Sequence, residues 1–88
     1  SMMIQTTVKV SGMACSMCEA HINDAIRAAF PVEKVSASHS KGEATIVSKE
    51  PLNAAALQKV INDTGYTAGD ITTAPYEKKG LFSFLKKK

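Results

Sequence analysis

Apolar residues recur along this chain at two different spacings, and the order of those spacings limits the folds that it can adopt. A spacing of two residues is typical of a half-buried strand, whereas spacings of three and four are typical of an amphipathic helix. The strand spacing covers residues 4–10, 35–37, 44–46 and 66–72, and the helix spacing covers residues 16–30 and 51–64. The sequence therefore predicts an α+β domain with the element order βαββαβ.

Glycine and proline residues mark the ends of the expected elements. Gly12 breaks the first strand, Pro31 stops the first helix, and Gly42 forms part of a tight turn between the two middle strands. Pro51 suits the first turn of the second helix, and Gly65 ends that helix. Six elements therefore follow one another closely. The last strand is the weakest of them, because it contains a further glycine.

The apolar faces of these elements predict one common core. An antiparallel sheet of four strands with both helices on one face, the ferredoxin-like sandwich, lets every such face turn inward. The residues expected to pack there are Ile4, Thr6, Val8 and Val10 of the first strand, Cys18, Ile22, Ala25, Ile26 and Ala29 of the first helix, Ala56, Leu57, Val60, Ile61 and Thr64 of the second, and Tyr66, Ala68 and Ile71 near the C-terminus.

The charge of the chain is divided unevenly along its 88 residues, a length that fits a single core. Residues 1–74 carry six Lys and Arg against seven Asp and Glu, whereas residues 75–88 carry five Lys against one Glu. We therefore expect a domain over residues 2–74 and a basic amphipathic tail over residues 75–88. The weakly acidic domain argues against nucleic acid as a partner.

The tail places four large apolar residues between two lysine clusters. Such a segment can dock on an anionic membrane surface or in a groove of a partner, although it is too short to span a bilayer. A solvated terminus, or an apolar segment folded back on the domain, remains the alternative. The chain shows neither a signal peptide nor an apolar run of about 20 residues. We therefore expect a cytoplasmic protein with reduced thiols, which the tail would make membrane-peripheral if it docks there.

The chain has two cysteines, Cys15 and Cys18, placed where the first strand gives way to the first helix. Two thiolates on so short a tether can close around one soft metal ion or oxidise to a disulfide, but they are too few for a structural zinc cage. Amide groups and the helix dipole at a helix N-terminus favour the thiolate over the thiol. Soft thiolates select Cu(I), for which two ligands suffice. The pair alone is a weak motif, since redox proteins also contain it.

The residues around the two cysteines resemble those of a known family. The segment Gly12-Met13-Ala14-Cys15-Ser16-Met17-Cys18 after the first strand, and the segment Asn62-Asp63-Thr64-Gly65-Tyr66 at the end of the second helix, resemble those of the heavy-metal-associated domain. Bacterial cytosolic copper chaperones are the closest look-alikes, over residues 6–71. The resemblance implies that Cys15 and Cys18 bind one Cu(I). It further implies delivery to a copper-transporting P-type ATPase or a copper-responsive regulator, without catalysis, by a chain that is monomeric without metal and open to a metal-bridged dimer.

The resemblance also implies supporting roles for Gly12, Met13 and Tyr66. Gly12 gives the backbone a tight path out of the strand, either for the site or simply for the turn. Met13 points into the core and anchors the loop. Tyr66 lies beside the metal, where it either shields the ion or packs against Met13. Ala14 departs from the family, in which threonine is frequent and offers a hydroxyl to the loop.

Three further side chains invite a functional interpretation. Met17 is expected to project outward, as a contact for a partner or a neutral spacer. His21 lies one helical turn after Cys18, and a solvated or capping role is favoured over a ligand role. His39 sits in the hairpin, far from the motif in sequence, and is expected to be a strand residue.

Three alternatives to a copper chaperone remain. A carrier of Hg(II) or another soft metal is the first, because two thiolates bind Hg(II) as readily and no residue discriminates against it. A thioredoxin-like or glutaredoxin-like thiol oxidoreductase is the second, although no aromatic residue precedes Cys15 and no proline separates the cysteines. A part of a larger transporter or reductase is the third.

Overall fold

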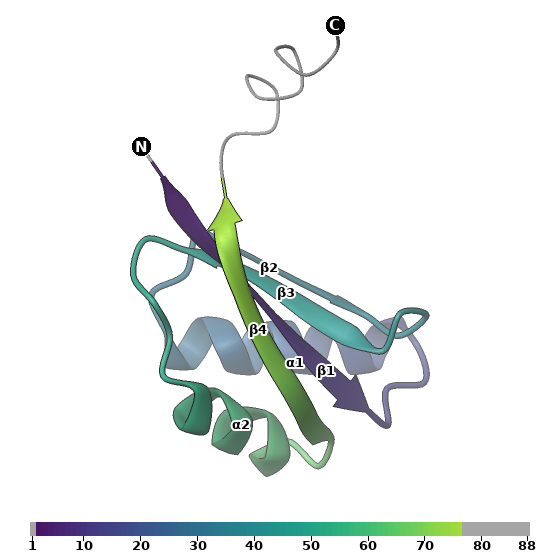
Figure 1. The fold of residues 1–88 in the computed structure, drawn as a ribbon. Coiled ribbons are helices and arrows are strands. Elements are labelled where there is room, and N and C mark those ends of the chain that lie inside the picture. The colour runs from purple at the N-terminus through teal and green to yellow at the C-terminus, as the bar shows by residue number, and fades with distance from the viewer. Residues whose placement is uncertain (1, 77–88) are drawn as a thin grey trace, which may run out of the picture.

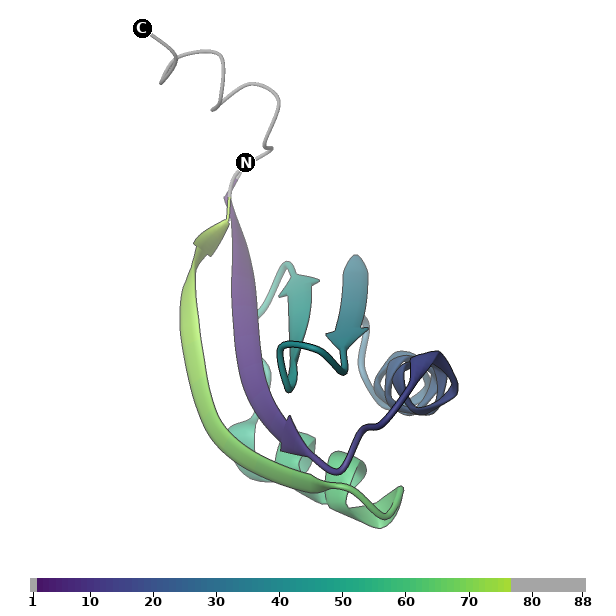
Figure 2. The same ribbon diagram turned by 90° about the vertical axis from the view of Figure 1, so that its right-hand side faces the viewer.

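A computed structural model of the chain describes residues 2–76 as one sheet covered by two helices. Both helices lie on the same face of the sheet (Figures 1 and 2). The strands pair antiparallel in the order β2-β3-β1-β4, so the predicted ferredoxin-like sandwich is confirmed. Neither described helix is long and apolar enough to cross a membrane. The elements are β1 (Met3–Ser11), α1 (Ser16–Ala29), β2 (Lys34–Ser38), β3 (Glu43–Ser48), α2 (Ala54–Asp63) and β4 (Thr67–Tyr76).

The core lies between the helices and the sheet, where the apolar faces predicted it, except that Ala29 at the end of α1 is exposed. Ile22 and Ile26 of α1 are fully buried, as are Leu57 and Ile61 of α2. Burial of one such side chain contributes about 1.5–3 kcal/mol, which makes these helix residues the main attachment of both helices to the sheet. The strand side of the core consists of Val8, Val10, Val35, Ala37, Ala44 and Ile46, with Met13, Tyr66, Ala68 and Ile71 packed around it.

The start of α2 differs from the prediction. The helix begins at Ala54, so Pro51 lies before it and not in its first turn. Asn53 is the N-cap residue, and its side-chain oxygen accepts a hydrogen bond from the amide of Ala56 at 2.8 Å. This bond satisfies one of the amides that the first turn leaves unpaired, which explains why the helix begins where the asparagine stands.

Strand β4 runs further than predicted, to Tyr76. The reason is that β1 offers pairing partners as far back as Met3, which pairs with Tyr76. Gly69 does not end the strand. It lies at a register shift opposite Lys9, where a Cβ atom on residue 69 would come within 3.3 Å of the Lys9 Cβ. The last two strand residues thus fall in the segment assigned to the tail. The rest of that segment, residues 77–88, lies outside the described residues, and its docking stays a prediction.

The antiparallel topology brings two loops that are distant in sequence to one end of the molecule (Figure 1). Ser11, the last residue of β1, pairs with Thr67, the first residue of β4. The loop that enters α1 and the loop that leaves α2 are therefore neighbours.

Replacing Thr6 by valine is expected to stabilise the domain. Thr6 is 1% exposed, and among the described residues its hydroxyl has no hydrogen-bond partner. Valine has nearly the same shape, so the change removes an unsatisfied polar group without opening a cavity, and the free energy of unfolding should rise by about 1 kcal/mol. Urea unfolding measures this, with Thr7→Val, on the opposite face of β1, as the control. A lower stability of Thr6→Val would show that the hydroxyl has a partner.

Candidate metal centre

The loop between β1 and α1 starts the helix and leaves a cysteine side chain free. Gly12 has a φ of +104°, a left-handed conformation that favours glycine, and it turns the chain away from the strand. Cys15 is the N-cap residue of α1, but its side chain makes no capping hydrogen bond. Its carbonyl oxygen accepts bonds from the amides of Cys18 and Glu19, at 3.1 and 3.2 Å. The backbone of Cys15 therefore begins the helix while its sulfur stays available.

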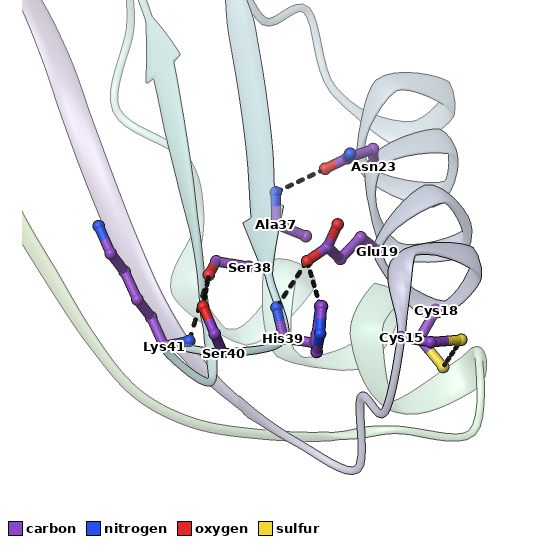
Figure 3. A network of polar contacts seen from close by, with 9 residues as sticks. All are labelled: Cys15, Cys18, Glu19, Asn23, Ala37, Ser38, His39, Ser40 and Lys41. Carbon is purple, nitrogen blue, oxygen red and sulfur yellow. Dashed lines mark hydrogen bonds and ion pairs between the residues drawn. The ribbon is translucent and has the colours of Figure 1, made fainter.

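The two sulfur atoms face each other at this helix terminus. Cys15 Sγ and Cys18 Sγ lie 4.0 Å apart (Figure 3), and both residues are free thiols, the first exposed and the second half-buried. A metal–thiolate bond measures about 2.3 Å for zinc, so an ion fits between the sulfurs after a small widening. Within residues 2–76 no three His, Cys, Asp or Glu side chains gather closely enough to hold a metal. The described pair therefore offers two donors.

Hydrogen-bond donors around Cys18 lower the pKa of its thiol to about 7. The backbone N–H of Ala14 contributes most, followed by the hydroxyl of Tyr66 and the backbone N–H of Cys15, while desolvation acts in the opposite direction. These donors stabilise the negatively charged form, as expected at a helix N-terminus. A metal-binding thiolate is thus substantially populated at neutral pH without a basic side chain.

Tyr66 belongs to the same site although 48 residues separate it from Cys18. It stands in the turn between α2 and β4, and its hydroxyl interacts with the Cys18 sulfur. This interaction, together with desolvation, raises the pKa of Tyr66, so the phenol stays neutral at pH 7. Its ring lies over the loop, since a Cβ atom on Gly12 would come within 3.3 Å of Tyr66 Cδ1. Gly12 thus makes room for the ring that reaches the cysteine.

The family model of the heavy-metal-associated domain matches residues 7–67, which include both cysteines and Gly12. The chain belongs to the heavy-metal-associated domain family. Within the matched region lie β1 from Thr7 onward, both helices and the hairpin of β2 and β3.

The proteins similar to this heavy-metal-associated domain include a mercuric reductase, a copper transporter domain and MerP. A mercuric reductase of Shigella flexneri is 30% identical over 63 residues, which is 72% of this chain but 11% of the reductase, so the chain spans a small part of that relative. The yeast copper transporter domain Ccc2a, solved in apo and Cu(I)-loaded states, is 28% identical, with a TM-score of 0.69 over 78% of this chain and 94% of that domain. Oxidised MerP of Ralstonia metallidurans is also 28% identical, with a TM-score of 0.64 over 74% and 92%.

Two methionines and two histidines are the remaining candidate residues of this heavy-metal-associated domain. Met13 packs against the core, and Met17 is 67% exposed, so both predicted orientations are confirmed. His21 is exposed, and its side chain makes no hydrogen bond or ion pair within residues 2–76. The prediction for His39 is wrong, because the chain turns after Ser38 and His39 lies in the turn between β2 and β3.

His39 contacts Glu19, a residue that the sequence did not single out. Glu19 follows Cys18 directly, and its carboxylate accepts a hydrogen bond from the backbone amide of His39 at 2.8 Å. An acidic residue in the first turn of a helix is a common feature with no special meaning. Its partner stands 20 residues later, so local sequence held no sign of the contact.

Alkylation of Cys18 by iodoacetamide is expected to reach half its maximal rate near pH 7. The thiolate is the nucleophile, so a lowered pKa moves the reaction to lower pH. Tyr66→Phe removes one donor to the thiolate and should move the midpoint upward. Tandem mass spectrometry of the metal-free protein, alkylated over a pH series, distinguishes the two cysteines. A wild-type midpoint at the ordinary thiol value of about 8.5 would contradict the described hydrogen bonds.

Proposed function

We propose that this heavy-metal-associated domain is a copper chaperone that carries one Cu(I) ion between Cys15 and Cys18. The observation that carries the proposal is the pair of donor sulfurs, which lie 4.0 Å apart. The lowered pKa of the Cys18 thiol adds to it. Cu(I) is soft and accepts two thiolates in a nearly linear arrangement, whereas zinc would need two more ligands. The similarity to a yeast copper transporter domain supports the choice of metal.

The exposed position of Cys15 suits transfer by ligand exchange. A thiolate of the partner forms a bond to the bound ion, which becomes three-coordinate, and a bond from the ion to one donor sulfur then breaks. The ion keeps its oxidation state, and the released thiolate remains on this domain. The partner in this proposal is a copper-transporting P-type ATPase or a copper-responsive regulator in the cytoplasm. Docking of the tail on the membrane would bring the carrier near such a transporter.

Transport of Hg(II) is the second candidate function. The similarity to a mercuric reductase favours it, and two thiolates bind Hg(II) as readily as Cu(I). A thiol oxidoreductase is less well supported, because the sheet order β2-β3-β1-β4 is that of a ferredoxin-like fold and not of a thioredoxin-like one. We therefore propose no catalytic reaction.

Native mass spectrometry after anaerobic loading tests the proposal. The reduced full chain, incubated with Cu(I) and excess glutathione, should retain one copper ion per chain, and the same spectrum reports any metal-bridged dimer. A parallel sample loaded with an equimolar mixture of Cu(I) and Hg(II) compares the two metals. Loss of all copper to glutathione would contradict the chaperone proposal, and selective retention of mercury would favour the second candidate.

A further inference from the structure

Glu19 and His39 join the first turn of α1, which carries Cys18, to the turn between β2 and β3. Glu19 Oε2 accepts a hydrogen bond from the backbone N–H of His39 at 2.8 Å and lies 2.6 Å from His39 Nδ1 (Figure 3). Both side chains are partly shielded from solvent, with exposed fractions of 25% and 42%. Hydrogen bonds to an ionised acceptor are about twice as strong as neutral ones. The contact therefore ties the first turn of α1 to the turn between β2 and β3.

A second contact of the same kind lies one helical turn further along α1. Asn23 Oδ1 accepts a hydrogen bond from the backbone N–H of Ala37 at 2.9 Å. Four residues of a helix advance about 6 Å, and two residues of a strand advance about 6.6 Å. The spacing of Glu19 and Asn23 along α1 therefore nearly equals the spacing of their partners, His39 and Ala37, along the other segment. Because β2 is an edge strand, these side chains satisfy outward-facing amides of the sheet edge and its following turn.

The two contacts differ in what they hold. Asn23 holds the middle of α1, which the buried Ile22 and Ile26 already fix to the sheet. Glu19 holds the first turn, where Cys18 lies and where Cys15 provides no side-chain cap. An uncapped helix terminus leaves amides unsatisfied and tends to fray. The cysteine that would bind the metal cannot also cap the helix, so the restraint has to come from elsewhere in the fold.

We propose that Glu19 and His39 are a positioning pair, which holds the first turn of α1 so that Cys18 Sγ stays within reach of Cys15 Sγ in the metal-free protein. This inference rests on the proposed copper site. The pair acts through the helix and does not touch the metal. Its effect comes from the two contacts to Oε2, which a neutral side-chain oxygen at the same position can still accept, although more weakly than a carboxylate.

Three variants separate this effect from charge and from general stability. Glu19→Gln retains an oxygen in place of Oε2 but loses the charge. Glu19→Ala loses both contacts while introducing the best helix former, so a looser turn could not come from helix propensity. Asn23→Ala removes the neighbouring contact to the same strand and serves as the matched control.

The first measurement is the rate at which a Cu(I) chelator removes copper from each full-length variant. Loss of a group that orients a metal ligand typically costs about 10–100-fold in affinity, so we expect Glu19→Ala to release copper about tenfold faster. Asn23→Ala should release it near the wild-type rate, and Glu19→Gln at a rate between those of the wild type and Glu19→Ala. Release at the wild-type rate by Glu19→Ala would overturn the inference. Equal changes in Glu19→Gln and Glu19→Ala would also overturn it, because they would show an effect of charge.

The second measurement does not depend on metal. Hydrogen exchange of the amides of Cys18 and Glu19, both bonded to the Cys15 carbonyl, should be faster in metal-free Glu19→Ala than in the wild type or in Asn23→Ala. If the wild type fails to retain copper, the proposed function fails, but this measurement still tests whether the pair holds the turn. Unchanged protection of both amides would overturn the positioning role.

Discussion

Replacing Cys15 or Cys18 by serine is expected to weaken Cu(I) binding by at least two orders of magnitude. Structural metal sites with four thiolate or imidazole ligands are worth on the order of 10–16 kcal/mol, or about 3 kcal/mol per ligand. A hydroxyl is a hard ligand that does not replace a soft thiolate for Cu(I). Since the described pair offers only two donors, the loss of either removes half of the site. Competition with a Cu(I)-specific chelator measures the change.

The fold should survive both substitutions, which makes the effect specific to the site. Cys15 is exposed and Cys18 is half-buried, and neither belongs to the buried core cluster. Serine at position 15 is also a favoured N-cap residue and should not weaken the start of α1. Thermal unfolding of the metal-free variants provides this control. Near wild-type copper affinity in either variant would contradict the proposed ligand pair.

Replacing Tyr66 by alanine is expected to speed chelator-driven release of copper about tenfold. The ring lies over the Gly12 loop and its hydroxyl interacts with the Cys18 sulfur, so its removal exposes the sulfurs to attack. Removal of a group that contacts and orients a ligand has effects of about 10–100-fold in comparable sites. The neutral phenol is a poor ligand for Cu(I), so the copper count should stay at one per chain. Stopped-flow transfer to a coloured chelator measures the rate.

Two variants show which part of Tyr66 matters. Tyr66→Phe keeps the ring and should change the release rate less than alanine does. Tyr76→Ala is the matched control, because Tyr76 ends β4 and bonds to Lys34, whereas Tyr66 precedes the start of the same strand. Should Tyr66→Ala release copper at the rate of the wild type, the residue only packs and shields nothing.

The candidate ligands could be found from sequence because they are close together along the chain. Cys15 and Cys18 are three residues apart at a helix start, where the spacing alone brings both sulfurs to the same side. The order of the elements was equally accessible, because the burial of one face repeats every two residues in β1 and every three or four in α1 and α2. Gly65, with a φ of +102°, likewise ends α2 where the sequence indicated.

Local competition decided the points at which the prediction failed. Both Pro51 and Asn53 are residues that begin helices, and the hydrogen bond that the Asn53 side chain accepts from the Ala56 amide determined the start of α2. The length of β4 depends on its neighbour, since β1 supplies pairing partners as far as Tyr76 whatever the propensity of Gly69. The end of a strand therefore depends on the strand beside it and cannot be predicted from its own residues alone.

The sequence by itself determined the family, the order of elements and the pair of thiols, because each of these depends on residues within a few positions of one another. The tertiary structure decided what surrounds the thiols. It brings Tyr66 to the Cys18 sulfur through the pairing of Ser11 with Thr67, and it brings His39 to Glu19 through the packing of α1 beside the edge strand β2. Contacts between residues 20 or 48 positions apart follow from the packing of whole elements, and no local pattern encodes them.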